Sequence, residues 1–104
     1  MSDYLEAMRQ DRRLAVLQTL IGSPDYTAHG HLLRQRLEAF GHRVSFDAVR
    51  GDLAWLDEQG LIVLAKGEIP VATLTLRGED VARGRAQVPG VASKLPGSFM
   101  GQDD

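Results

Sequence analysis

The sequence predicts a mainly α-helical domain with a small β-hairpin and a short fourth helix. Apolar residues recur at helical spacing in three long segments, and two short segments rich in β-branched residues follow them. Glycine or proline separates these segments, as expected at helix ends and in turns. At 104 residues, of which 43% are hydrophobic and 25% charged, the chain has the size and composition of one globular domain.

The first predicted helix runs from about Asp3 to Ile21. Asp3 and Glu6 have the spacing of a capping box, in which two side chains satisfy free N–H groups at a helix start. Apolar residues then recur at helical spacing: Leu5, Met8, Leu14, Val16, Leu17 and Leu20. The segment Gly22–Asp25 ends the helix, because its glycine accepts a left-handed cap and its proline cannot continue a helix.

Two further helices are predicted before Gly60. Thr27 is the expected N-cap of the second, which ends near Phe40, and its apolar residues share one face: Leu32, Leu33, Leu37 and Phe40. Ser45 is the expected N-cap of the third, which runs to Gly60. The buried stripe of the third helix consists of residues at positions i, i+4 and i+7: Val49, Leu53 and Leu56.

Residues 61–76 predict the β-hairpin. Leu61–Ala65 is too short for a helix and rich in β-branched residues, Lys66–Pro70 is a turn, and Val71–Leu76 alternates as a return strand. Arg77 to about Arg85 is a short fourth helix, weakened by two glycines. Residues 1–86 therefore form the predicted domain, and we expect the proline- and glycine-containing tail, residues 87–104, to be mobile.

The order of these elements predicts a winged helix-turn-helix fold, which is a three-helix core with a two-stranded wing. The short link Gly41–Val44 joins the two helices of the helix-turn-helix unit, and the hairpin closes the open side of the core. The segment from Leu53 to Ile62 has the pattern L-x-x-L-x-x-x-G-L-[IV] and resembles the third helix and first wing strand of winged-helix regulators. Thr75–Gly78 resembles the T-x-x-G segment that follows the wing in such proteins.

Over nearly its whole length the chain also resembles a family of small proteins encoded in Mu-like prophages. The resemblance rests on four segments: Asp11–Leu14, Gly41–Ser45, Asp52–Leu56 and Val88–Val91. It implies a winged-helix-like fold and a phage origin, and it brings no activity with it.

The composition argues against several classes of function. The chain has no cysteine, which removes disulfides, thiolate catalysis and cysteine-bearing zinc sites. His29, His31 and His42 form no metal-binding motif, since residues two apart on a helix point in different directions. The sequence has neither a nucleophile elbow nor a phosphate-binding glycine-rich loop, so we expect no enzyme activity and no cofactor. Without a signal peptide or a membrane-spanning segment, we expect a cytoplasmic protein.

Double-stranded DNA is one predicted partner, because the third helix of this fold enters the major groove. The predicted contact residues are basic or begin that helix: Arg34, Arg43, Ser45, Arg50 and Lys66. The third helix itself has a net charge of −3, from one arginine and four carboxylates: Arg50 against Asp47, Asp52, Asp57 and Glu58. Because phosphate contacts need positive charge, the sequence predicts weak or assisted binding. The alternative is that the arginines pair with the acidic third helix and contact no DNA.

A second copy of the chain is the other predicted partner. Apolar residues occupy two sides of the first helix, and one small core cannot cover both sides. The stripe predicted to form a homodimer interface consists of Tyr4, Leu5, Met8 and Val16. The alternative is that the fourth helix or the segment Val88–Val91 covers this stripe within one chain.

These observations lead to two hypotheses of function. The first is a phage-encoded, dimeric winged-helix protein that binds DNA weakly or with help, in a regulatory role. The second is a protein–protein interaction module that keeps the fold without DNA binding and contacts another phage or host protein. The acidic third helix and Trp55, which we expect to be exposed, favour the second hypothesis.

Overall fold

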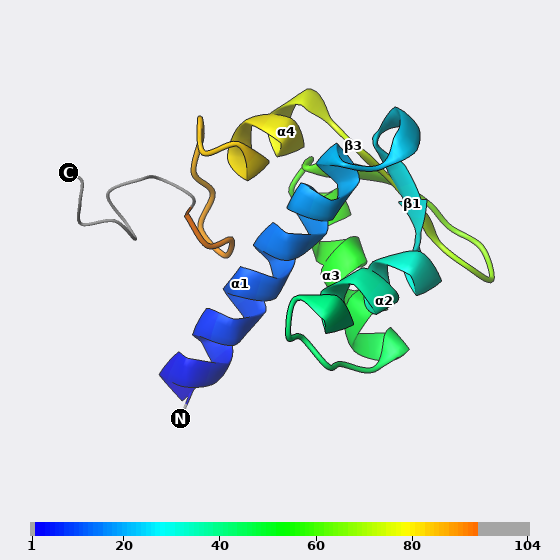
Figure 1. Ribbon diagram of the computed structural model, residues 1–104. Coiled ribbons are helices and arrows are strands. Elements are labelled where there is room, and N and C mark those ends of the chain that lie inside the picture. The colour runs from blue at the N-terminus through cyan, green and yellow to red at the C-terminus, as the bar shows by residue number, and fades with distance from the viewer. Residues whose placement is uncertain (1, 94–104) are drawn as a thin grey trace.

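The computed structural model describes residues 2–93, which form a mainly helical domain with a small antiparallel sheet (Figure 1). In chain order the elements are α1 (Ser2–Ile21), the 3-10 turn η1 (Pro24–Tyr26), β1 (Thr27–His29), α2 (Gly30–Ala39), α3 (Phe46–Glu58), β2 (Ile62–Ala65), β3 (Val71–Leu74) and α4 (Leu76–Ala82). The predicted class is confirmed at this level, and the arrangement is compatible with a winged helix.

The second helix begins two residues later than predicted, and the residues before it form a strand. Thr27 does not cap the helix, because β1 pairs antiparallel with β3, with Thr27 opposite Thr73. The N-cap of α2 is His29, whose Nδ1 accepts a hydrogen bond from the backbone N–H of Leu32 at 3.2 Å. The sheet therefore has three strands in the order β1-β3-β2, where the sequence predicted a two-stranded hairpin.

The core lies between α1, the other helices and the inner face of the sheet. Figure 1 shows α1 as a long diagonal helix, with α4 on one side and the sheet on the other. The fully buried large side chains come from α1, α2, α3 and the start of the hairpin: Val16, Leu17, Leu20, Leu33, Leu37, Val49, Leu53, Leu56, Leu61 and Ile62. The predicted stripe of the third helix thus meets Leu33 and Leu37 of the second helix in one core. Of the other two residues in the predicted stripe of the second helix, Leu32 is half-buried and Phe40 is 61% exposed, so the prediction was wrong for Phe40.

The folded part of the chain extends beyond the predicted boundary at residue 86. Val88 and Val91 are buried in the core, and the backbone N–H of Ala92 donates to the carbonyl oxygen of Gln10 at 3.1 Å. These contacts explain why the segment is ordered against α1 despite its proline and glycine content. Residues 94–104, the rest of the predicted mobile tail, lie outside the described residues.

The junction between the hairpin and α4 explains the T-x-x-G segment. The Thr75 hydroxyl accepts a hydrogen bond from the backbone N–H of Gly78 at 3.0 Å and donates to the carbonyl oxygen of Gly60 at 2.8 Å. Thr75 therefore caps α4 and also ties it to the end of α3. The helix ends at Ala82, earlier than predicted, because Gly84 adopts a φ of 83°.

Candidate functional site

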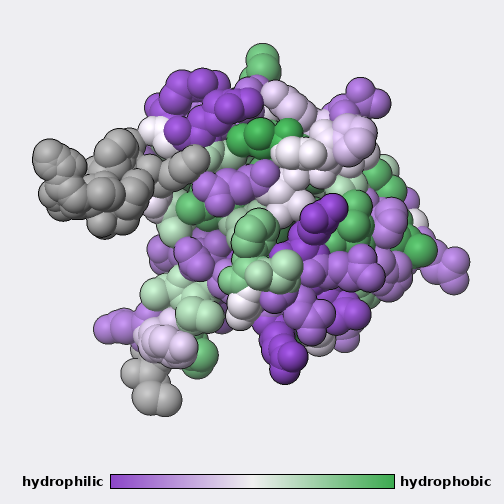
Figure 2. Space-filling view, viewed as in Figure 1, coloured by the Kyte–Doolittle hydropathy of each residue, from purple (hydrophilic) through white to green (hydrophobic). Residues whose placement is uncertain are grey.

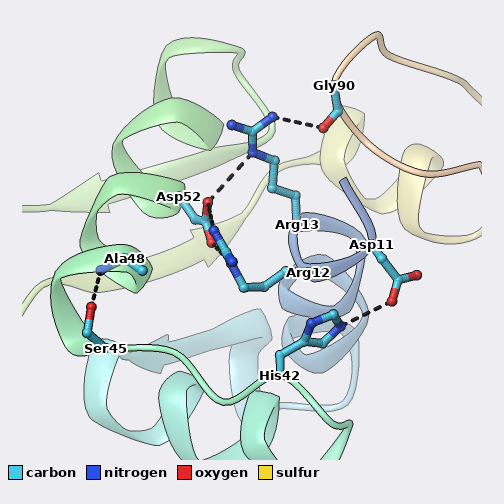
Figure 3. Close-up of polar contacts among 8 residues, drawn as sticks. All are labelled: Asp11, Arg12, Arg13, His42, Ser45, Ala48, Asp52 and Gly90. Atoms are coloured by element: carbon cyan, nitrogen blue, oxygen red, sulfur yellow. Dashed lines mark hydrogen bonds and ion pairs between the residues drawn. The ribbon is translucent and has the colours of Figure 1, made fainter. Parts of the chain in front are cut away.

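The solvent-facing side of α3 is a single stripe of exposed residues. They fall at helical spacing along the helix: Asp47, Arg50, Gly51, Ala54 and Glu58. Ser45 holds the start of α3 as predicted from its position, since its hydroxyl accepts from the backbone N–H of Ala48 at 3.1 Å (Figure 3). The predicted DNA-contacting residue Ser45 thus has a structural role at the helix start.

Asp52 does not lie on this exposed stripe, although it contributes to the net charge of −3 that the sequence gives for the third helix. Its side chain is buried and receives both Nε and Nη2 of Arg12, the latter at 3.1 Å. Nε of Arg13 lies 3.7 Å from the same carboxylate. Figure 3 shows both arginines reaching from α1 to Asp52 on α3. One of the four carboxylates of α3 is therefore neutralised inside the protein.

Trp55 is half-buried and covered by a cation, where the sequence predicted an exposed side chain. The Arg13 guanidinium lies 4.0 Å from the centroid of the Trp55 ring and donates to the carbonyl oxygen of Gly90 at 3.0 Å. Burial lowers the pKa of Arg13, and the nearby charge of Asp52 opposes this shift. Trp55 therefore belongs to the contact between α1, α3 and the C-terminal segment.

Asp57 is also engaged within the fold. Its Oδ1 accepts a hydrogen bond from the backbone N–H of Leu64 at 3.3 Å, which joins the end of α3 to β2. Among the four carboxylates of α3, only Asp47 and Glu58 are exposed. The exposed stripe therefore carries one arginine and two carboxylates, so it is much less acidic than the whole helix.

Arg50 and Lys66, two predicted contact residues, lie together in a hollow between α3 and the β2–β3 hairpin. The hollow has a volume of about 220 Å³ and is lined by Arg50, Ala54, Leu64, Lys66, Gly67 and Pro70. Nη1 of Arg50 donates to the backbone carbonyl oxygen of Glu68 in the hairpin loop at 3.3 Å. We call this feature the α3–hairpin groove. It holds two positive charges between mostly apolar or small side chains.

Two aromatic side chains, Phe46 and His31, lie next to Arg50 beside the groove, and they were not predicted from the sequence. Phe46 lies 5.6 Å from the Arg50 guanidinium and stacks on the ring of His31 with a centroid distance of 4.4 Å. No sequence motif joins these residues. The contact exists because the starts of α2 and α3 are adjacent, so that a methyl group at Gly30 would lie 3.0 Å from the Phe46 ring.

The other two predicted contact residues lie apart from the α3–hairpin groove. Arg43 is exposed after α2, and its Nε lies 3.7 Å from Oε2 of Glu38. Arg34 is half-buried on α2, and neither arginine is among the described residues that line the groove. Figure 2 shows a largely hydrophilic surface over the α2 side of the molecule. The structure thus brings Arg50 and Lys66 together but leaves Arg34 and Arg43 outside.

The stripe predicted for a dimer interface is divided by the fold. Tyr4 and Leu5 are 66% and 57% exposed, and Met8 is half-buried. In Figure 2 the N-terminal end of α1 lies at lower left, where part of the surface is pale to green. Val16 is fully buried in the core, so its predicted place in a dimer interface is wrong. The reason is that α1 is covered along its second half and projects at its N-terminal end.

The histidines have structural partners. His42 is buried and its Nε2 lies 3.1 Å from Oδ2 of Asp11, while His29 caps α2. Within residues 2–93, no group of three His, Asp or Glu side chains is placed to hold a metal ion. Over the same range, no helix combines the length and apolar character needed to cross a membrane.

Two known proteins are similar to the chain over most of its length. The uncharacterized protein gp26 of Escherichia phage Mu is 42% identical over 92 residues, which cover 88% of this chain and 95% of gp26. An uncharacterized protein of Haemophilus influenzae is 38% identical over 76 residues, which cover 71% of this chain and 74% of that protein. No protein-family model matches the chain. No solved structure shows a significant match to it.

Proposed function

The chain belongs to the family of Mu-like phage proteins that includes gp26 of phage Mu. We propose that it is a winged-helix protein that binds double-stranded DNA, and this proposal rests on the order of its elements and on the basic residues of the α3–hairpin groove. In this proposal α2 and α3 form the helix-turn-helix unit, the β2–β3 hairpin is the wing, and the role is regulatory. The observation that carries the proposal is the α3–hairpin groove, in which Arg50 and Lys66 face the side where DNA would lie.

The positions of the carboxylates support this proposal over a protein-interaction module. The acidic third helix was the main argument against DNA, yet Asp52 is paired with Arg12 and Asp57 bonds to the backbone of β2. The predicted exposure of Trp55 favoured a protein partner, but in the structure the Trp55 ring is half-buried and lies against the Arg13 guanidinium. Arg34 and Arg43 remain proposed contacts on the α2 side of the same DNA. We propose no enzymatic activity and a cytoplasmic location, where phage DNA is accessible.

DNA binding is tested with the full chain and labelled mixed-sequence duplexes at low salt, by fluorescence anisotropy. We expect binding at roughly 10⁻⁵ M protein, within the range of non-specific protein–DNA affinities. Arg50→Ala and Lys66→Ala should each weaken binding by about tenfold, because each removes one charge-assisted contact.

The matched control is Arg36→Ala, which removes an exposed arginine of α2 beside a different hollow, next to Phe40. It should leave the affinity within about twofold if the groove, and not general charge, attracts the DNA. Absence of binding by the unmodified protein would contradict the proposed function.

We also propose a homodimer through the projecting end of α1. Tyr4 and Leu5 are large apolar side chains in contact with water, and their burial against a second copy would stabilise an assembly by about 25 cal/mol per Å². Leu5→Glu is expected to give a monomer at concentrations where the unmodified protein is a dimer, as measured by sedimentation equilibrium. A monomeric unmodified protein would contradict this proposal. Ala7→Glu, a change at an exposed small residue on the same turn, serves as the charge control.

A further inference from the structure

We infer that the α3–hairpin groove holds a phosphate of the DNA backbone between Arg50 and Lys66, and that the protein binds duplex DNA without sequence preference. This inference rests on the proposed function and specifies which part of the DNA is contacted. Sequence-specific proteins read base edges, mainly with Arg, Lys, Asn and Gln side chains, whereas phosphate contacts carry no sequence information directly.

The exposed stripe of α3 has few of the side chains that most often read bases. Between Phe46 and Glu58 there is no Lys, Asn or Gln, and Arg50 is the only residue of the four types. Gln59 follows the helix, but it is half-buried at the far end, and its backbone carbonyl oxygen accepts from Nε of Arg77 at 3.2 Å. A helix presented to the major groove by this face has one basic side chain and no amide side chain with which to distinguish base pairs.

That one side chain is directed toward the hairpin. Nη1 of Arg50 bonds to the carbonyl oxygen of Glu68, which holds the guanidinium at the wall of the groove it shares with Lys66. A guanidinium has five N–H donors, so this single bond leaves donors for a ligand. An arginine and a lysine on two walls of one hollow suit a phosphate group, which accepts hydrogen bonds from several directions.

The surroundings of the groove restrict where a phosphate can lie. Asp47 and Glu58 stand at the two ends of the exposed stripe and repel phosphates there. Between them, Gly51 and Ala54 offer almost no side chain, and a methyl group at Gly51 would meet no atom within 4 Å. The DNA backbone is therefore able to approach α3 closely only along the middle of the stripe, beside Arg50.

The inference is tested by comparing affinities for unlabelled competitor duplexes of equal length and different sequence. AT-rich, GC-rich and mixed duplexes should compete within about threefold of one another, whereas specific binding typically gives ratios of about 10³ or more. Arg50→Lys should keep the affinity within about threefold, because lysine also binds phosphate as a point charge. Lys66→Ala should lower the slope of log affinity against log salt by about one, as loss of one phosphate contact requires.

The outcomes separate this inference from the proposed function. Enrichment of one sequence from a pool of random duplexes, together with loss of binding in Arg50→Lys, would show base reading and overturn the inference while DNA binding stands. An unchanged salt slope in Lys66→Ala would also overturn it, because the groove would then hold no phosphate. Failure of the unmodified protein to bind any duplex would remove the proposed function itself.

Discussion

Replacing Gly78 with alanine is expected to destabilise the protein by about 3 kcal/mol or more, at the upper end of small-to-large substitutions. A methyl group at this position would lie 2.0 Å from the carbonyl oxygen of Leu61 and 2.8 Å from Cδ1 of Leu74. The first contact is with backbone, which cannot move aside as a flexible side chain does. Either α4 must separate from the start of the hairpin, or the cap formed by Thr75 must open. Urea denaturation followed by circular dichroism measures the loss.

The same substitution at Gly51 is the control, and its expected effect has the opposite sign. Gly51 lies in the middle of α3 with open space around it, so alanine meets no steric obstacle there. Alanine in a helix interior is more favourable than glycine by about 0.5–1 kcal/mol, because the unfolded chain loses less entropy. If Gly78→Ala were as well tolerated as Gly51→Ala, the close packing of α4 against Leu61 would be refuted.

The second large effect is expected at Asp52, whose replacement by alanine should cost about 3–5 kcal/mol. The carboxylate is almost completely buried, and the side chains of Arg12 and Arg13 facing it are only 15% and 12% exposed. Removing Asp52 leaves two positive charges together in a site with little water. The two guanidinium groups would then repel each other, because the carboxylate that lies between their charges in the unmodified protein is gone. The midpoint of thermal or urea unfolding reports this change.

Two variants test whether charge pairing is the cause. Glu58→Ala removes an exposed carboxylate near the end of the same helix and should change the stability by less than about 0.5 kcal/mol. The double variant Asp52→Leu with Arg12→Met replaces both members of the main pair by apolar groups, and it should recover much of the lost stability. A double variant as unstable as Asp52→Ala would indicate that packing, and not the buried pair, holds α1 against α3.

The helices were predictable because their signals are local. The apolar spacing and the Ser45 cap placed α3 to within two residues at its end. The buried position of Asp52 was also readable in principle, since it falls three residues after Val49 and one before Leu53, on the apolar stripe. The strand β1 was not readable, because three residues carry little pattern and Thr27 is equally suited to a cap. Its identity depends on pairing with β3, more than forty residues later, as the Thr27–Thr73 register shows.

The candidate site was predictable only in part. Arg50 and Lys66 were identified from their charge and position, because a hairpin that follows α3 directly must lie near it. The partners of the basic residues were not predictable. Arg43 lies near Glu38, and Phe46 stacks on His31, through contacts between segments with no shared motif. Which basic side chains line the groove therefore depends on tertiary contacts that the sequence pattern does not reveal.

The bonds of Arg12 and Arg13 also constrain the order in which the chain can complete its fold during translation. Arg12 finds its partner 40 residues later, and the bond from Arg13 to Gly90 spans 77 residues. Until Asp52 has been added, Arg12 and Arg13 lack their carboxylate partner, and until Gly90 has been added, Arg13 lacks its second partner. Contacts of such long sequence separation form late, because closing the intervening loop costs entropy first. The domain thus reaches its final packing only when nearly all of it has been synthesised.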